Sequence, residues 1–567
     1  MNHSMRCPYI VSLAFTLLLL PASLHAQQSS PSPAPSPSPA PIRAICWQAV
    51  EITLVSQVAY ARPFYDVDVT ATFTGPDGVT IERPAFWDGG TTWRVRFAAT
   101  KPGRWTYVTA ASDGSNKGLD GDAGTVLVEP YRGDLAVYKH GFVTISPNRR
   151  YFVYADGTPF FYLGDTHWFA MKERFASSNL PGCPSQFKRY VDLRSAQGFT
   201  VYQTEWGMGG WPAKDFDCGY NWKDGIGESD LPGFHNVDRK FAYLAEKGMV
   251  VANAVTWRTT IADFDDAYLR RLGRNWSARY GAYPVLWTMA QEVDCADPND
   301  PPGLVGKWQT MADALSASDA YHHPLTAHMH EEFRVTASTS VWRDKPYHTW
   351  FAVQNISNNG RLHKDGPLWD STAKEYWDSL PTKPAILYEG QYENYGTDVN
   401  NARINAYAPF LCGFYGCGYG TAAIWDDHYT LEEAARDQKT LDGTCNVWYE
   451  ALDRPGATQM SYLAKFFQSL EWWKLIPRFD IGQWLTVADP EDARLASTDG
   501  VTVVLYWGRD RLRLHRLVPG RVYAASWYDP RQGAWIPIGD ALANARGDWA
   551  APPMPGRTDY LLVLKSQ

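Results

Sequence analysis

Hydrophobic and polar positions follow different patterns in different parts of the chain. Over residues 44–131, apolar and polar residues alternate in short runs separated by turn signals such as Gly75-Pro-Asp-Gly78, which predicts a half-buried antiparallel sheet. The predicted strands are 50–55, 65–73, 93–97, 105–109 and 124–129. Their size favours an immunoglobulin-like β-sandwich. Further strand-like runs at 501–506, 521–527 and 560–564 predict a smaller β-sandwich over residues 478–567.

Between residues 141 and 477, short apolar runs alternate with amphipathic segments, which is the pattern of a parallel sheet. The predicted strands are 160–163, 200–203, 250–253, 285–288, 325–328, 351–354, 385–388 and 421–425. The predicted helices are 186–196, 238–246, 265–280, 304–317, 371–380 and 402–411. This repeat predicts a (β/α)8 TIM barrel. A doubly wound open sheet is the alternative, but Gly164-Asp-Thr-His167 is not the glycine-rich phosphate turn that such a sheet carries.

The first 26 residues have the pattern of a secretory signal peptide. Arg6 precedes an apolar run over residues 10–20, and a small-residue exit follows at Leu24-His-Ala26. The run is too short for a membrane anchor, and no other run of spanning length follows. We therefore expect an exported protein, periplasmic or extracellular, with no membrane span. Residues 27–43, rich in Pro and Ser, predict an extended linker.

Composition narrows the class of protein. A chain of 567 residues predicts about three domains. A net charge of -8 without a block of Lys or Arg argues against a nucleic-acid partner. Aromatic residues make up 14% of the chain, which suits either large cores or a sugar-binding surface. We expect a monomer or a homodimer that takes a polysaccharide or oligosaccharide as substrate.

Cysteine and histidine spacing gives no metal site and no cofactor is expected. Signal-peptide cleavage would remove Cys7 and leave seven cysteines, an odd number for an oxidising compartment. The candidates for local disulfides are Cys183 with Cys218 and Cys412 with Cys417.

Two of the predicted barrel strands lead into a glutamate. Glu292 follows the run at 285–288, and Glu389 follows the run at 385–388. The C-terminal ends of barrel strands are where such barrels carry their active sites. Two carboxyls there are what glycoside hydrolysis requires, one to protonate the leaving oxygen and one to attack the sugar or activate water. Either glutamate alone could be a helix cap or part of an ion pair, but the two together predict a glycosidase.

Polar and aromatic residues occur at the ends of nearly all the other predicted strands, which is typical of a saccharide site. The candidate substrate-binding residues are Asp165, His167, Gln203, Glu205, Trp206, Asn253, Trp257, Gln291, His328, Gln354, Tyr388, Tyr392, Trp425 and Asp426. Of His328 and His330, only one can face inward, because alternate residues of a strand point to opposite sides. The chain has no HExxH arrangement for a metal centre and no Gly-x-Ser-x-Gly motif for a serine hydrolase.

Several segments resemble a known family, the apiosidase-like (β/α)8 glycoside hydrolases. The strand-one, strand-seven and strand-eight motifs correspond to Phe161-Tyr-Leu-Gly-Asp-Thr-His-Trp168, Tyr388-Glu-Gly-Gln-Tyr392 and Gly418-Tyr-Gly-Thr-Ala-Ala-Ile-Trp425. Segments 86–90, 93–97 and 101–107 resemble the β-sandwich that often precedes this barrel. The segment 522–531 resembles the small β-domain, sometimes labelled collagen-binding, that often follows it.

The resemblance implies that Glu292 is the acid/base and Glu389 the nucleophile of a retaining mechanism. Family members tend to carry Gly-Gly before a strand-four acid that is often Asp, whereas this chain has Ala290-Gln291-Glu292, so the sugar is not identified. Burial beside Trp287, or the charge of Glu389, is expected to raise the pKa of Glu292. The carboxyl separation, which decides between retention and inversion, is left open by the sequence.

A different class of function is also compatible with the pattern. The chain could be a non-catalytic carbohydrate-binding protein or adhesin with a relic barrel. The presence of both acids and of a polar rim disfavours this alternative.

Overall fold

The structure is a computed structural model that describes residues 40–206, 225–258, 260–293, 304–329, 341–354, 368–395, 397–436 and 446–567. Residues 41–567 form one compact unit. The predicted signal peptide, Cys218 and His330 lie outside the described residues. Within the described ranges, no helix has the length and apolar character needed to cross a bilayer.

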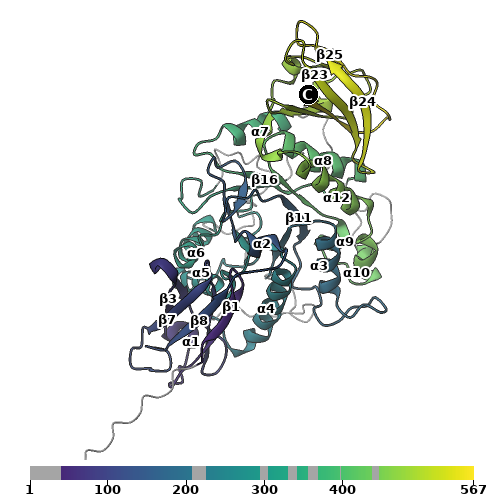
Figure 1. Cartoon of the computed structure of the whole chain (residues 1–567). Helices are drawn as coiled ribbons and strands as arrows, with labels where there is room; N and C mark the ends of the chain where they lie inside the picture. The colour runs from purple at the N-terminus through teal and green to yellow at the C-terminus, as the bar shows by residue number, and fades with distance from the viewer. Residues whose placement is uncertain are drawn as a thin grey trace, which may run out of the picture. The chain divides into compact units, whose positions relative to one another are not determined.

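The central sheet is parallel and TIM-barrel-like, with the strand order β14-β13-β12-β11-β17-β16-β15 (Figure 1). Its strands are β11 (Tyr162–His167), β12 (Val201–Glu205), β13 (Val250–Ala254), β14 (Val285–Met289), β15 (Phe351–Gln354), β16 (Ala385–Glu389) and β17 (Gly416–Tyr419). All six pairs of neighbouring strands in this order are parallel. Six of these strands lie within a few residues of their predicted positions.

The helices predicted between the strands are present. They are α3 (Gln186–Ala196), α4 (Leu231–Glu246), α5 (Asp266–Tyr280), α6 (Leu304–Ser318), α7 (Leu368–Asp378) and α8 (Val399–Leu411). Three of them begin at a side chain that accepts a hydrogen bond from the first turn, namely Ser185, Asp265 and Asp398. Such caps satisfy backbone N–H groups that a helix otherwise leaves unpaired, and they fix where each helix begins.

The predicted fifth strand forms isolated parallel bridges rather than a regular strand. Leu325 bridges to Trp287 of β14, and His328 bridges to Ala352 of β15. The segment therefore links the two edge strands of the sheet.

The prediction of the eighth strand at residues 421–425 is wrong. The apolar run there forms the short helix α9 (Ala422–Trp425), and the strand is β17. A Cβ atom on Gly416 would lie 2.6 Å from the Cβ of Tyr162, and one on Gly418 would lie 2.1 Å from the carbonyl oxygen of Tyr388. Glycine lets this strand approach its neighbours, but it is depleted in strands, so an apolar-run criterion passes over the segment.

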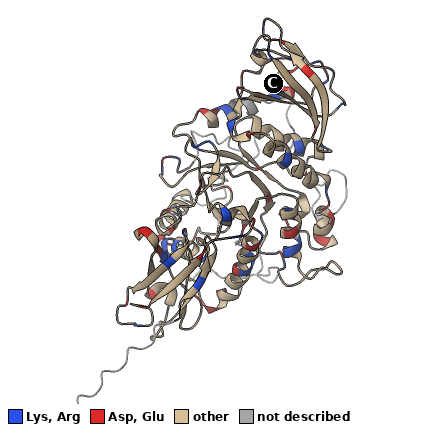
Figure 2. Cartoon of the chain, in the orientation of Figure 1, with Lys and Arg blue, Asp and Glu red and all other residues tan. Residues whose placement is uncertain are grey.

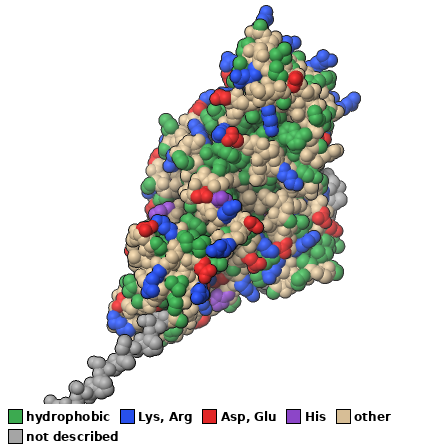
Figure 3. Space-filling view, in the orientation of Figure 1, with side chains coloured by type: hydrophobic (Ala, Val, Ile, Leu, Met, Phe, Trp, Pro, Cys, Tyr) green, Lys and Arg blue, Asp and Glu red, His purple; other side chains and the backbone are tan. Residues whose placement is uncertain are grey.

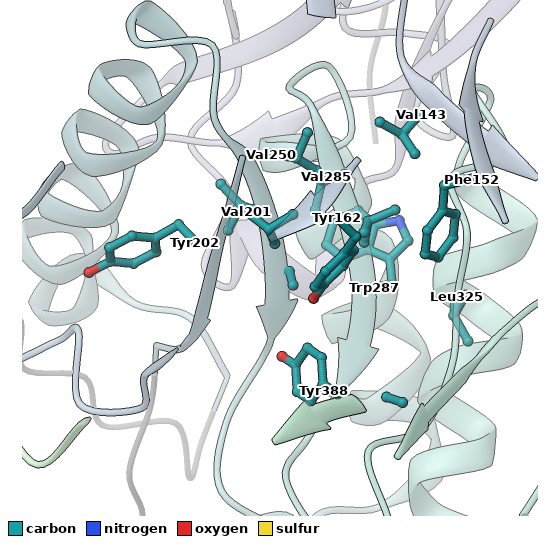
Figure 4. Close-up of a cluster of buried hydrophobic side chains, with 14 of the residues drawn as sticks. Val143, Phe152, Tyr162, Val201, Tyr202, Val250, Val285, Trp287, Leu325 and Tyr388 are labelled. Atoms are coloured by element: carbon teal, nitrogen blue, oxygen red, sulfur yellow. The ribbon is translucent and has the colours of Figure 1, made fainter. Parts of the chain in front are cut away.

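Aromatic and branched side chains fill the interior of the sheet. Figure 4 shows Tyr162, Trp287 and Tyr388 gathered with Val201, whereas the neighbouring Tyr202 points away from them. Successive residues of a strand face opposite sides. The later residues Gln203 and Glu205 of β12 therefore share the interior face with Val201.

The N-terminal strand-rich region contains two sheets, with the orders β1-β8-β7-β3-β4 and β2-β6-β5. The strands are β1 (Ile42–Ile45), β2 (Ala49–Val55), β3 (Val69–Thr74), β4 (Thr80–Pro84), β5 (Phe86–Trp87), β6 (Thr92–Ala98), β7 (Gly103–Ala111) and β8 (Ala123–Glu129). The strand predicted from residue 65 begins only at Val69. The helix α1 (Pro63–Asp66) precedes it, with a proline at its start, a position that proline favours.

Buried arginines join this region to helix α5. The guanidinium of Arg83 donates to the carbonyl oxygen of Ser277 at 2.7 Å, and that of Arg96 donates to the carbonyl oxygen of Arg279 at 2.8 Å. Arg96 and Arg279 also share the carboxylate of Asp238. A helix leaves carbonyl groups of its last turn without a partner, and Arg96 supplies a donor to that of Arg279. The carbonyl oxygen of Ser277 already accepts from the N–H of Gly281 at 2.9 Å, and Arg83 is its second donor.

The C-terminal strand-rich region also has two sheets, with the orders β18-β20-β21-β26-β23-β24 and β19-β22-β25. The strands are β18 (Ile476–Pro477), β19 (Leu485–Thr486), β20 (Ala493–Ser497), β21 (Val501–Tyr506), β22 (Arg513–Leu514), β23 (Val522–Asp529), β24 (Ala534–Leu542), β25 (Trp549–Ala550) and β26 (Tyr560–Ser566). The other strands and helices are β9 (Val143–Ile145), β10 (Phe152–Tyr154), α2 (Ala136–Lys139), α10 (Leu431–Arg436), α11 (Trp448–Ala451), α12 (Pro455–Gln468) and α13 (Ile481–Trp484).

The predicted disulfide between Cys412 and Cys417 is wrong. No disulfide joins these two buried residues, of which Cys412 lies at the C-terminal cap of α8 and Cys417 within β17. They pack as apolar side chains in the core, and burial raises the pKa of the Cys417 thiol.

An ion pair with no solvent exposure connects α8 to the C-terminal region. Arg403 donates to both carboxylate oxygens of Asp559, and its remaining guanidinium nitrogen donates to Gln459 at 2.8 Å. Both side chains of the pair are 0% exposed. Removing one partner of such a pair leaves a buried charge without compensation.

We expect Asp559→Ala to lower the free energy of unfolding by about 3–5 kcal/mol, because it strands the Arg403 charge. The matched control is Asp77→Ala, which removes the carboxylate of the exposed Lys101–Asp77 pair and should change stability by about 1 kcal/mol or less. Chemical denaturation of the full chain measures both. Equal stability of the two variants would contradict a supporting role for this contact.

Charged residues of both signs are interspersed over the secondary structure (Figure 2). On the face drawn in Figure 3, Lys and Arg alternate with Asp, Glu and apolar side chains. That face lacks the extended basic surface on which nucleic-acid binding depends.

Candidate active site

Glu292 and Glu389 lie at the C-terminal ends of two strands of the central sheet. Glu389 is the last residue of β16, and Glu292 follows the end of β14 by three residues. Gln354, the last residue of β15, donates from one nitrogen to Glu292 Oε1 at 3.2 Å and to Glu389 Oε2 at 3.1 Å. Since both distances share that nitrogen, the two oxygens are no farther apart than their sum, about 6.3 Å. The structure thus brings the two predicted acids together.

Irregular backbone aims these side chains. The register between β15 and β16 shifts after Val353, so that Gln354 comes to lie opposite Glu389. After β14 the chain turns through two non-glycine residues with positive φ, Met289 at 63° and Glu292 at 51°. Bulges redirect side chains near active sites, and a left-handed residue other than glycine costs roughly 1–2 kcal/mol. The placement of Glu292 therefore carries local strain.

Glu389 is held by aromatic donors. The Tyr392 hydroxyl donates to Glu389 Oε1, and the indole N–H of Trp168 donates to the Tyr392 oxygen at 2.5 Å. Nε2 of His328 lies 3.2 Å from Glu389 Oε2. Burial and the charge of Glu389 raise the pKa of Tyr392 well above its usual range, so the phenol stays protonated and keeps its role as a donor.

Glu292 is paired with an arginine that the sequence reasoning missed. Arg258 donates to Glu292 Oε2 at 2.5 Å, and its guanidinium lies over the ring of Trp257 at 4.7 Å from the centroid. The sequence offered one signal for Arg258: it is a basic residue directly after Trp257, shortly beyond the predicted strand 250–253. Trp287, which was expected beside Glu292, donates its indole N–H to Asp319 at 3.0 Å.

Aromatic rings line the surroundings of Glu389. Trp425, placed on α9 rather than on a strand, stacks on Tyr392 with ring centroids 5.6 Å apart. The ring of Trp168 lies 5.8 Å from that of His328 and 5.5 Å from that of Tyr388. Flat apolar rings beside polar groups suit the C–H faces and hydroxyls of a sugar.

Buried polar atoms without a protein partner gather at the same end of the sheet. Glu205, Asn253 and Gln291 are at most 4% exposed, and each has side-chain atoms that lack a hydrogen bond to a described residue, as does the hydroxyl of Tyr388. Buried polar groups are ordinarily paired. Their accumulation here is typical of a place that receives a polar ligand.

Asp165 and His167 belong to a different, fully buried network. Asp165 accepts from Arg194 of α3 at 2.5 Å, and His167 lies between Asp165 at 3.2 Å and Glu173 at 2.6 Å. Burial alone would lower the pKa of His167, but the charges and hydrogen bonds of Glu173 and Asp165 outweigh it and raise the pKa to about 9. Since these groups are engaged with α3 and with one another, we assign them a structural role.

Other predicted site residues also lie among the packed elements. Gln203 donates to the carbonyl oxygen of Tyr388 at 2.5 Å, inside the sheet. Trp206 packs against Phe241 of α4, and the carboxylate of Asp426 lies 3.8 Å from Lys172. None of these three contacts involves Glu292 or Glu389.

Within the described ranges, no group of three or more His, Cys, Asp or Glu side chains is arranged to hold a metal ion. The site consists of carboxyls, their donors and aromatic rings.

Solved structures similar to this fold are glycoside hydrolases by name. One named "Glycoside hydrolase" has a TM-score of 0.61 and 19% identity, over 76% of this chain and 98% of that one. A structure from Bacteroides vulgatus, provisionally described as a glycoside hydrolase, has a TM-score of 0.65 and 17% identity, over 93% of this chain and all of the other. A family 5 glycoside hydrolase from the same organism has a TM-score of 0.61 and 18% identity, over 76% of this chain and 94% of that one. At these identities the likeness shows the fold.

The family that the sequence matches is one of glycoside hydrolases, in agreement with the barrel-like sheet. The model of the "Apiosidase-like, catalytic domain" family matches residues 146–474, and a domain of unknown function, DUF5060, matches residues 43–112. The first match spans more than half of the sequence, and the chain belongs to the apiosidase-like family. The resemblance noted in the sequence is thereby confirmed. No curated protein matches the chain.

Proposed function

We propose that the chain is an exported, retaining glycoside hydrolase that cleaves glycosidic bonds in a polysaccharide or its side chains. The observation that carries the mechanism is the amide of Gln354, which donates to both glutamates from one nitrogen. The two hydrogens of an amide nitrogen diverge by roughly 120°, so the two oxygens would lie about 5.5 Å apart. That separation favours retention, at about 5–5.5 Å, over inversion, at about 6.5–9.5 Å.

In the proposed first step, Glu389 attacks the anomeric carbon while the glycosidic C–O bond breaks and Glu292 gives a proton to the leaving oxygen. In the second step, Glu292 takes a proton from water, the water oxygen bonds to the anomeric carbon, and Glu389 departs. Tyr392 and Gln354 orient the nucleophile in both steps, because both donate to its oxygens.

The proposal extends to export and architecture. Residues 1–26 would direct export, since their charge and apolar pattern is that of a signal peptide. The bridges at residues 325–328 support a complete (β/α)8 barrel, and the paired sheets on either side support flanking β-sandwiches, the first immunoglobulin-like.

The stereochemistry of the first product tests the mechanism. Incubation of the full chain with a panel of plant and microbial polysaccharides should release sugar, and proton NMR at early times should show the anomer of the substrate linkage. The opposite anomer would overturn the retaining assignment, and no release from any substrate would favour a carbohydrate-binding protein.

A further inference from the structure

A third carboxyl, Glu205, lies inside the sheet near the two proposed catalytic glutamates. It is the last residue of β12 and pairs in register with Ala254 of β13. By the alternation along β12 it shares the interior face with Gln203, which reaches the backbone of Tyr388, directly before Glu389. Glu205 therefore lies two residues nearer the C-terminal end of β12 than Gln203.

The surroundings of Glu205 disfavour a charge on it. The side chain is 0% exposed, and neither carboxyl oxygen accepts a well-formed hydrogen bond from a described residue. Burial and the negative charge of Glu292 raise its pKa well above the usual range, and only the Arg258 guanidinium and the backbone of Gln291 act in the opposite direction. These surroundings favour the protonated form of Glu205.

Glu292 is in the opposite situation. Its Oε2 accepts from Arg258 at 2.5 Å and its Oε1 accepts from Gln354 at 3.2 Å. Both oxygens of the residue proposed to donate a proton thus accept hydrogen bonds, whereas neither oxygen of its buried neighbour Glu205 has a well-formed partner among the described residues.

We infer that Glu205 and Glu292 share one proton and act together as the acid/base of the reaction. The inference rests on the proposed function. In the glycosylation step, the Glu205 O–H bond breaks and its proton moves to Glu292, which passes it to the leaving oxygen as the glycosidic C–O bond breaks; Glu292 then returns, without a proton, to its pair with Arg258. In the second step, the proton lost by the attacking water restores the Glu205 acid. Glu205 does not contact the sugar in this scheme. It acts through Glu292 by supplying the proton that Glu292 passes on, so it is a positioning residue.

The proposed steps leave the net charge of the site unchanged. Before the reaction the charges are those of Glu389, Glu292 and Arg258, which sum to one negative charge. In the glycosyl-enzyme, Glu389 is a neutral ester and Glu205 is ionised, so the sum is unchanged. A buried site tolerates a shift of charge within it better than a change in its net charge, because desolvation disfavours each uncompensated ion.

Infrared difference spectroscopy of the full chain with ¹³C-labelled glutamate tests the inference without any substrate. The spectrum should contain a protonated-carboxyl band at neutral pH that disappears in Glu205→Gln. In Glu292→Gln the same band should titrate at lower pH, because the neighbouring negative charge is gone. The matched control is Glu393→Gln, which removes a buried carboxyl that accepts from Tyr419 and Gly456. A Glu393 band should not respond to Glu292→Gln. An ionised Glu205 at neutral pH, or a band that ignores Glu292→Gln, would overturn the inference.

The kinetic test uses a polysaccharide that the panel identifies as a substrate. Glu205→Gln should reduce kcat at pH 7 by on the order of 10–100-fold, and the alkaline limb of the pH profile should move to lower pH, because Glu292 must then take its proton from solvent. If the role of Glu205 were purely structural, Glu205→Gln would lower the melting temperature and leave the pH profile in place, as expected for Glu393→Gln.

The outcomes of this test separate the two proposals. An unchanged pH profile in Glu205→Gln overturns the inference. A wild-type enzyme that cleaves nothing overturns the proposed function and leaves the infrared result standing. If Glu205→Gln does not fold, the shift of the Glu205 band in Glu292→Gln decides the matter.

Discussion

Replacing Glu389 by alanine should lower kcat by several orders of magnitude while leaving the fold intact. The substitution removes the atom that forms the bond to the anomeric carbon. It also releases Tyr392 and Gln354 from their contacts with the carboxylate, but it removes no contact between the central sheet and the flanking regions. Steady-state kinetics on a substrate from the polysaccharide panel measures the loss, and circular dichroism verifies the fold.

Added azide distinguishes a lost nucleophile from general damage. In Glu389→Ala, azide can occupy the space of the missing carboxylate and attack the anomeric carbon from the same side, so a glycosyl azide of inverted configuration should form. The control Glu393→Ala removes a buried carboxyl four residues along the chain, and any activity it loses should not return with azide. Turnover near the wild-type level in Glu389→Ala would remove Glu389 from the mechanism.

Glu292→Gln should show an effect that depends on the leaving group. With natural glycosidic linkages, which need a proton on the departing oxygen, kcat should fall about 10²–10⁴-fold. Nitrophenyl glycosides leave as stable anions, so their first step should suffer far less. The glutamine can still accept from Arg258, which limits disturbance of the contact at Glu292 Oε2.

The comparison of the two substrate types provides the internal control for this variant. Loss of folding or of substrate binding would affect both types alike. An equal loss on both would therefore contradict an acid role for Glu292 and would direct attention to Glu205 as the donor in its own right.

The spacing of apolar residues along the sequence predicts the position of most strands of the central sheet. The bounds of β15 were predicted without error, and those of α3 were as well, because their apolar residues fall at the spacing that burial imposes. It failed at β17, where Gly416 and Gly418 are required by close approach and carry no apolar side chain to reveal the strand. At these two positions, the close packing requires glycine, and glycine removes the apolar side chains by which a strand is recognised in the sequence.

The two candidate acids can be predicted from the sequence, but the side chains that contact them cannot. Strand ends gave Glu292 and Glu389, whereas the bulge that brings Gln354 opposite Glu389 leaves no mark on composition. Asp165 and His167 also end a strand, yet they belong to the buried network with Arg194. Which face of a strand meets the site depends on the exact register, and a shift of one residue reverses it.

The arginines that close the end of α5 make the N-terminal strand-rich region a component of the catalytic fold and not a detachable accessory. Without this region, the carbonyl oxygen of Arg279 would lose its donor Arg96, and that of Ser277 would keep only the N–H of Gly281. Evolution could exchange this region for another only if the newcomer also supplied a donor to Arg279. The pairing of the two regions is therefore expected to be inherited as a unit, and a search for the substrate specificity of the barrel should use proteins that retain both.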